Sequence, residues 1–291
     1  MNKCIFNGKI LRDRKIVSVY NGSFLYGVNC FEGMRGYWNI FSEQMLLIDL
    51  NRHIDRLYLS AERMRFNIRV TKEEIIVQIR QFIMKENIKE NIYLRITFFI
   101  DGETSWMEHQ NISYLISFRS IESNLVKEIN PKKYSLKTSS IIRNSEQGTP
   151  PSIKAGGNYL NSRYAKIEAQ EYGFDDALML NHKGFISEAT GSCIFFVKDG
   201  LLYTPSLDCD ILASITRYRI ISLCKKKGIE VIEGKFKIED LIRSDAAFLC
   251  GTMIEIMPIS KIDNTKFDTT NSSMYRKIVG LFKESLIFEN I

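Results

Sequence analysis

The most informative stretch of this 291-residue chain reads Lys154-Ala155-Gly156-Gly157-Asn158-Tyr159-Leu160-Asn161-Ser162. A lysine stands before two glycines, and the residues from about 158 to 171 have the pattern of a helix. A lysine in this setting is a candidate catalytic residue. Taken alone, the stretch also fits an ordinary solvated lysine before a helix, so its meaning depends on the rest of the chain.

Three later segments carry further candidates for chemistry. Glu188 lies in a loop of small residues before an apolar strand, and Ser214 and Thr216 stand where a helix begins. Free backbone N–H groups at a helix start favour an anion such as a phosphate. Gly251-Thr252 forms a turn at a strand end that could add further N–H donors. Taken one by one, the segments also fit a loop carboxylate, a plain helix cap and a plain turn.

In this order and spacing, the segments resemble the class IV (fold-type IV) pyridoxal-phosphate enzymes, and most of all the branched-chain aminotransferases. The family's pattern K-x-x-G-N-Y-L-N-S matches residues 154–162, and its pattern E-A-x-x-x-G-[YF]-D-[DE]-A matches residues 168–177. In the N-terminal half, residues 26–37 match Y-G-x-x-x-F-E-G-x-R-x-Y, and residues 53–57 match H-x-x-R-L. The resemblance covers about residues 6 to 262, nearly the whole chain.

The resemblance implies pyridoxal 5′-phosphate as the cofactor and assigns its contacts. Lys154 would carry it as an aldimine and then move a proton between two carbons. Glu188 matches the partner of the pyridine nitrogen, and Tyr159 matches the phenol that binds the ring oxygen O3′. The remaining assignments are Arg56, Ile215, Thr216 and Thr252 for the phosphate, and Leu212 for the face of the ring.

The resemblance also implies a substrate pocket. The matching residues of the N-terminal half are Phe31, Gly33, Arg35, Tyr93 and Arg95, and Met253 lies on the turn that borders the substrate in the family. Tyr93 and Arg95 correspond to the family's Y-x-R pair, in which the arginine can hold the second carboxylate of glutamate. From the residues alone, Tyr93 also fits a core aromatic and Arg95 a surface charge.

The function implied is a ping-pong transamination between an L-amino acid, branched-chain or otherwise apolar, and 2-oxoglutarate, by a homodimeric enzyme. An aminodeoxychorismate lyase, a D-amino acid transaminase and an amine transaminase share the cofactor motifs and stay open. A non-catalytic pyridoxal-phosphate-binding protein is the alternative from another class, and the intact pair of Lys154 and Glu188 argues against it.

Several residues depart from the family pattern. Cys193 replaces an asparagine, and Ser214 replaces a glycine, which a negative φ at this position would permit. Met253 and Ile254 replace two small residues after the Gly-Thr turn. These departures leave the cofactor chemistry intact and leave open which amino acid is the substrate, including a substrate of a specialised biosynthetic pathway.

Composition narrows the class of protein. The chain is 45% hydrophobic, which is enough for a full core, and its net charge of +6 is spread along the sequence, which is poor evidence for nucleic-acid binding. No segment has the length of a membrane span, and residues 1–8 lack the apolar stretch of a signal peptide, so neither a membrane protein nor a secreted one is expected. The six scattered cysteines and three histidines form no metal pattern. We expect reduced core cysteines in a cytoplasmic enzyme that binds no metal.

The pattern of strands and helices predicts a mixed α+β fold in two domains. We expect a small α/β domain over residues 1–120, a linker over 121–133, and a larger, β-barrel-like α/β domain over 134–291 that holds the cofactor. Asn7-Gly8 predicts a hairpin, and Thr71 to Glu74 predict a capping box. Further strands are expected at 31–38, 45–49, 92–100, 113–118, 134–142, 177–180, 194–198, 229–232 and 246–250, and further helices at 52–64, 158–171, 214–227 and 273–288.

Overall fold

The structure, a computed structural model, describes residues 4–11, 18–102, 105–123 and 132–288. The chain contains two compact units. The first comprises residues 1–122 and 153–157, and the second comprises residues 123–152 and 158–291. This division places Lys154 in the first unit, whereas the sequence predicts it within the larger domain over residues 134–291. Most of the expected linker, residues 124–131, lies outside the described residues.

The first unit is built on an antiparallel sheet of six strands in the order β2-β1-β6-β5-β3-β4. The predicted hairpin is confirmed, because Asn7 and Gly8 both have positive φ between β1 and β2. The short helix α1 (Gly22–Tyr26) precedes β3. The strands are β1 (Cys4–Phe6), β2 (Lys9–Leu11), β3 (Asn29–Asn39), β4 (Gln44–Leu47), β5 (Ile92–Ile100) and β6 (Ile112–Ser120).

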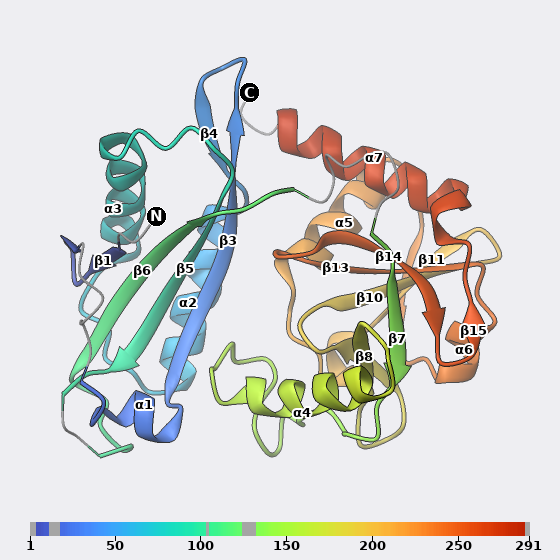
Figure 1. Cartoon of the computed structure of the whole chain (residues 1–291), viewed down its shortest axis with the longest axis horizontal. Helices are drawn as coiled ribbons and strands as arrows, with labels where there is room; N and C mark the ends of the chain where they lie inside the picture. The colour runs from blue at the N-terminus through green and yellow to red at the C-terminus, as the bar shows by residue number, and fades with distance from the viewer. Residues whose placement is uncertain (1–3, 12–17, 103–104, 124–131, 289–291) are drawn as a thin grey trace. The chain divides into compact units, whose positions relative to one another are not determined.

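Two helices cover one face of this sheet, as Figure 1 shows. They are α2 (Leu50–Arg63) and α3 (Lys72–Lys85), and the predicted capping box at Thr71 and Glu74 opens α3. Apolar side chains of both helices pack against alternate residues of β3, β5 and β6. Phe82 of α3 stacks on Phe118 of β6 with ring centroids 4.1 Å apart. Burial of these side chains fixes which face of the sheet is turned away from the helices.

The second unit contains a mixed sheet in the order β12-β11-β10-β13-β14-β7-β8-β9, with β15 paired to β14. The edge strand β9 also contacts β10 and β11, so the sheet curls on itself. The expected strand over 134–142 ends at residue 138, and β9, β11 and β14 are additional strands. The strands are β7 (Tyr134–Thr138), β8 (Asp176–Leu180), β9 (Ile186–Ala189), β10 (Cys193–Lys198), β11 (Leu201–Pro205), β12 (Val231–Gly234), β13 (Ala246–Gly251), β14 (Glu255–Ile262) and β15 (Thr265–Lys266).

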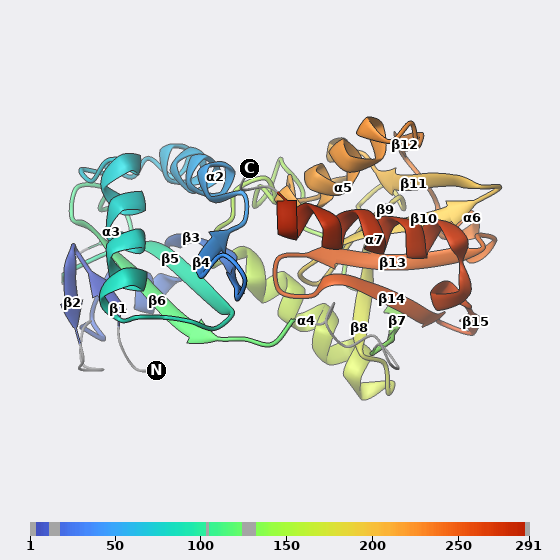
Figure 2. The ribbon, with the colours of Figure 1, turned by 90° about the horizontal axis from the view of Figure 1, so that it is seen from above.

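Helices lie on the outside of the curled sheet. α5 (Ile215–Lys226) and α7 (Ser273–Phe288) pack together over β10 and β13, and Figure 2 shows them side by side. α4 (Asn158–Glu171) packs on β8, and the short α6 (Ile238–Ile242) precedes β13. A second apolar cluster, formed by the opposite residues of the same strands, fills the inside of the curl. The predicted mixed α+β fold class is therefore confirmed, down to the barrel-like second unit.

Candidate active site

One face of the first sheet collects the predicted substrate residues. Phe31, Gly33 and Arg35 alternate along β3 and therefore point to the same side. Their partners on β5 include Arg95 opposite Gly33 and Tyr93 opposite Arg35. Because the residues between them pack toward α2 and α3, this face is the one that the helices leave uncovered. The structure thus brings all five predicted residues of the first unit onto one wall.

The wall combines aromatic rings with cations. The guanidinium carbon of Arg95 lies 3.5 Å from the centroid of the Phe31 ring. Arg119 of β6 lies 4.8 Å from the centroid of the Tyr93 ring. Arg35 is buried, and its Nη1 donates a hydrogen bond of 3.1 Å to the carbonyl of Glu122. Arginines whose stems and planes cover aromatic rings offer both apolar surface and positive charge.

Gly33 is required by the close approach of Tyr93. A Cβ atom at residue 33 would lie 1.9 Å from the hydroxyl oxygen of Tyr93 and 2.6 Å from the ring carbon that bears it. The tyrosine ring therefore lies directly over the glycine. Any side chain at this position displaces the ring from the wall.

We expect Gly33→Ala to lower the free energy of unfolding by about 1–3 kcal/mol, the usual scale of overpacking. The loss should shrink when Tyr93 is also replaced by alanine, because the clashing ring is then gone. Denaturant unfolding of the two single variants and the double variant measures this coupling. Equal losses in both backgrounds would show that Tyr93 does not cover residue 33.

Lys154 belongs to a short segment that extends the edge of β3. Its carbonyl accepts a hydrogen bond of 3.0 Å from the amide of Phe31, and its own amide donates to the Ser60 hydroxyl at 3.2 Å. Ala155 bridges Cys30, and Gly156 approaches Asn29 so closely that a Cβ would lie 2.5 Å from its side-chain oxygen. The backbone of the lysine is therefore fixed on both sides, and its Nζ lies 5.0 Å from the centroid of the Phe31 ring.

Arg56, the predicted phosphate ligand, is held by a buried network on α2 and β3. Its Nε and Nη2 donate to the two carboxylate oxygens of Glu32 at 2.6 and 2.9 Å, and Nδ1 of His53 lies 2.8 Å from the same carboxylate. Glu32 is fully buried and His53 nearly so. Burial opposes the charged form of Glu32, but Arg56 and His53 lower the pKa of its carboxyl to about 2. Burial also lowers the pKa of His53.

This network predicts a loss of stability in acid. Unfolding raises the pKa of Glu32 to its usual 4.5, so the unfolded chain gains a proton as the pH falls below that value. His53 acts in the same direction below 6.5, because its pKa is lower in the folded state. Glu32 contributes about 3 kcal/mol near neutral pH, lost progressively between pH 4.5 and 2. Denaturant unfolding against pH should therefore give a steeper fall for the wild type than for Glu32→Gln; parallel curves would contradict the assignment.

In the second unit, Glu188 of β9 is the centre of a second cluster. Glu188 is 5% exposed, and its carboxylate pairs with Arg143, a residue of the loop after β7. The amide of Leu212 donates to Oε1 at 3.3 Å, and the thiol of Cys193 lies 3.8 Å from Oε2. Among the described residues, that thiol is the one hydrogen-bond donor near Oε2. A weak donor leaves this oxygen able to accept a strong hydrogen bond from a bound group.

The N-terminus of helix α5 comes shortly after Leu212 in the chain. Ser214 caps it with a φ of −68° and accepts a hydrogen bond from the amide of Arg217, so the replacement of glycine is accommodated. Ile215 and Thr216 are the first residues of the helix, where amides lack partners within the helix. Such an end attracts a phosphate group. The residues present in this unit therefore fit a phosphorylated pyridine cofactor: an acceptor for the ring nitrogen and a helix start for the phosphate.

The remaining predicted residues of the second unit lie near these elements or on helix α4. The turn of Thr252 and Met253 follows β13, which pairs with β10 through Cys193 and Cys250. Met253 is 37% exposed, whereas Ile254 packs on the apolar cluster inside the curl. Tyr159, in the first turn of α4, is 40% exposed.

Three residues of these clusters have no role predicted from the sequence: Glu32, His53 and Arg143. The first two lie inside the matched motifs, whose letters alone do not say which side chain holds which. Arg143 is 45 residues away from its partner Glu188. Its position in a polar loop carries no sequence signal of a buried ion pair.

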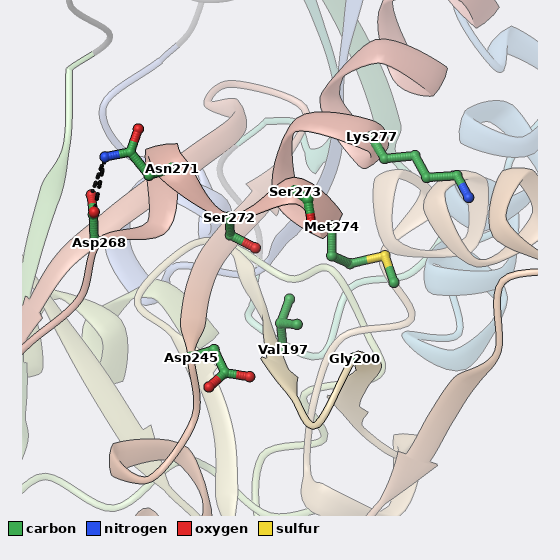
Figure 3. A pocket seen from close by; sticks show the side chains of 9 residues that line it. All are labelled: Val197, Gly200, Asp245, Asp268, Asn271, Ser272, Ser273, Met274 and Lys277. Carbon is green, nitrogen blue, oxygen red and sulfur yellow. Dashed lines mark hydrogen bonds between the residues drawn. The ribbon is translucent and has the colours of Figure 1, made fainter.

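A surface hollow of about 670 Å³ lies elsewhere in the second unit, around the start of α7 (Figure 3). None of the residues predicted to bind cofactor or substrate lines it. The amide of Asn271 is already bonded to Asp268 there. Among the described residues, no three side chains of histidine, cysteine, aspartate or glutamate are grouped to bind a metal ion. The helices in the described part of the chain include none with the length and hydropathy of a membrane span. All six cysteines are buried free thiols.

Known proteins with a similar sequence and fold indicate the family of this chain. The model of the amino-transferase class IV family matches residues 29–262. A putative branched-chain-amino-acid aminotransferase of Methanocaldococcus jannaschii is 35% identical, over 97% of this chain and 96% of its own length. The branched-chain aminotransferase of Thermoproteus uzoniensis, solved with norvaline, superposes with a TM-score of 0.91 at 30% identity, over 99% of this chain and 95% of that chain.

The T.th. branched-chain amino acid aminotransferase, solved in complex with N-(5′-phosphopyridoxyl)-L-glutamate, superposes with a TM-score of 0.89 at 26% identity, over 98% of this chain and 94% of that chain. These matches confirm the resemblance predicted from the motifs, with the aminotransferase class and the pyridoxal-phosphate dependence that it implies. The chain belongs to the class IV aminotransferase family.

Proposed function

We propose that this protein transfers the amino group between branched-chain or similar apolar L-amino acids and 2-oxoglutarate. The observation that carries this proposal is the wall of the first sheet, where the guanidinium of Arg95 lies 3.5 Å from the ring centroid of Phe31. Such a wall accepts an apolar side chain through its rings and a second carboxylate through its cation. The ligands named for the related structures, norvaline and a phosphopyridoxyl-glutamate, belong to the same two chemical classes.

When bound, pyridoxal phosphate supplies an electron sink for the carbanion that forms at the substrate Cα. Lys154 would hold the cofactor through its Nζ, and the same amine would move the proton at the substrate Cα. Glu188 would keep the ring nitrogen protonated through Oε2, and Tyr159 would donate to the ring oxygen. Leu212 would pack on the ring. Arg56, Ile215, Thr216 and Thr252 would hold the phosphate.

A panel of amino acids tests the proposal. The purified protein, supplied with pyridoxal phosphate, is offered leucine, isoleucine, valine and glutamate in L and D forms, together with small amines. We expect conversion of the L-amino acids with 2-oxoglutarate as acceptor. Turnover of D-amino acids or amines alone, or release of pyruvate from aminodeoxychorismate, would instead identify one of the alternative family activities. No turnover with any of them would support a non-catalytic protein.

Arg95→Gln should weaken the glutamate half-reaction more than the half-reaction with leucine. Removing the charge costs about 1.5–3 kcal/mol of binding for a substrate whose carboxylate uses it. Leucine does not use that charge, so its loss should be much smaller. Stopped-flow absorbance of the cofactor gives kcat/KM for each half-reaction. Equal losses would show that Arg95 supports the fold or the carboxylate that both substrates share.

We also propose a homodimer, in keeping with a patch of exposed apolar residues on the first unit. The patch comprises residues of α1, of the segment just before α1 and of the segment after β5. These segments lie close together, since a Cβ on Gly22 would lie 3.4 Å from the carbonyl oxygen of Ser105. Its members, each more than half exposed, are Val19, Tyr20, Phe24, Leu25, Tyr26, Trp106 and Met107. Exposed apolar patches of this kind mark protein interfaces. Sedimentation equilibrium should give twice the chain mass for the wild type and a lighter species for Phe24→Asp.

The six buried free thiols support a reducing compartment, and we propose the cytoplasm.

A further inference from the structure

The two carboxylate oxygens of Glu188 have unequal surroundings. Oε1 accepts three hydrogen bonds: from Nε of Arg143 at 3.1 Å, from Nη2 of Arg143 at 2.8 Å, and from the amide of Leu212 at 3.3 Å. Oε2 has the Cys193 thiol at 3.8 Å. One oxygen is therefore saturated by the protein, and the other is left to a weak donor.

Arg143 is itself fixed from several directions. It is 8% exposed, and its backbone amide donates to the carbonyl of Leu180 at the end of β8. Its third nitrogen, Nη1, donates to the side-chain oxygen of Asn161 at 3.4 Å. The amide of Asn161 returns a hydrogen bond of 2.9 Å to the carbonyl of Ile142. The loop that carries the arginine is thus tied both to the sheet and to α4.

We propose that Arg143 is a positioning residue of the enzyme, which fixes Glu188 by Oε1 and thereby presents Oε2, charged, to the ring nitrogen of the cofactor. The proposal rests on the role of Glu188 given above. A buried carboxylate without a cationic partner either takes up a proton or turns toward another donor. In either case the charged and correctly turned carboxylate is populated less, so the ring nitrogen has its anionic partner for only part of the time.

The planar geometry of the arginine guanidinium matters as well as its charge. Two N–H groups of one planar guanidinium converge on a single oxygen, which fixes the rotation of the carboxylate. A lysine supplies the charge from one flexible point and leaves that rotation free. Arg143→Lys should therefore keep a positive charge beside Glu188 but not the orientation of its carboxylate, and Arg143→Met should keep neither.

The experiment compares Arg143→Met and Arg143→Lys with the wild type in three measurements: the dissociation constant of pyridoxal phosphate, the absorption spectrum of the bound cofactor against pH, and kcat/KM against pH. We expect Arg143→Met to lower kcat/KM roughly tenfold to a hundredfold, the scale of groups that orient the direct ligands of a site. Its cofactor spectrum and its pH profile should differ from those of the wild type, because removing the cation changes the charge around the ring nitrogen. Arg143→Lys should lie between the two.

Arg219→Met is the matched control, since Arg219 is equally buried in this unit and donates to the Ser285 hydroxyl. It should lower the melting temperature and leave the pH profile and the spectrum unchanged. Wild-type pH profiles and spectra in Arg143→Met, or the same shifts in Arg219→Met, would overturn the proposal. If Arg143→Met does not fold, Arg143→Lys decides by the same criteria. An unimpaired Glu188→Gln would instead refute the role of Glu188 itself.

Discussion

Lys154→Ala should abolish transamination, with kcat lowered at least about ten-thousandfold. The alanine offers neither an amine to carry the cofactor nor a base to move the proton. A base from solution cannot replace Lys154, because the backbone of this residue is hydrogen-bonded on both sides and holds the amine in place. The variant should still bind pyridoxal phosphate through the phosphate contacts. Amino-acid turnover and equilibrium dialysis of the cofactor measure the two properties separately.

Borohydride reduction and peptide mapping identify the lysine directly. In the wild type the label should appear on Lys154. Lys166 is the matched control, because it lies on α4 and already interacts with Asp176 and the carbonyl of Asp175. Lys166→Ala should remain active and labelled. A label on Lys166, or activity in Lys154→Ala, would remove the assignment.

Glu188→Gln should retain the cofactor and lose about a thousandfold in kcat, which corresponds to about 4 kcal/mol of transition-state stabilisation. An amide has no charge to keep a proton on the ring nitrogen, so the ring accepts electrons less readily. The amide also places an NH₂ group or a neutral oxygen against Arg143.

Single-turnover absorbance with L-leucine gives this rate without interference from product release. Glu168→Gln is a suitable comparison. Glu168 lies near the C-terminus of α4, and its carboxylate also accepts several hydrogen bonds, here from Ser139 and Ser140. It should change stability and leave the rate nearly unaltered. Turnover of Glu188→Gln within threefold of the wild type would make Glu188 a structural residue.

The sequence predicted most elements whose signals are local. Apolar alternation over residues 92–100 gives β5 to the residue, and the capping box at Thr71 marks the start of α3. The strand expected over 134–142 stops at Thr138, and Arg143, beyond its end, pairs with Glu188. This buried ion pair joins residues 45 positions apart, so no local pattern contains it.

The candidate site also contains features that the sequence predicts and features that it does not. Lys154 and Glu188 were predicted through ordered motifs, because each motif preserves a residue type at a fixed spacing. The sharing of one wall by Tyr93 and Arg95 was also predictable, since residues two apart on a strand face the same side. The contact of Glu32 with Arg56 was not, because it joins a strand to a helix 24 residues later, and its geometry depends on how the helix packs.

The alternation along β3 has a practical consequence for engineering. Residues 31 and 35 lie on the face that we propose for the substrate, whereas Cys30, Glu32 and Met34 are fully buried toward the helices. A library randomised at positions 31, 35, 93 and 95 should therefore vary selectivity and leave the apolar cluster under the helices unchanged, with Gly33 kept to seat Tyr93.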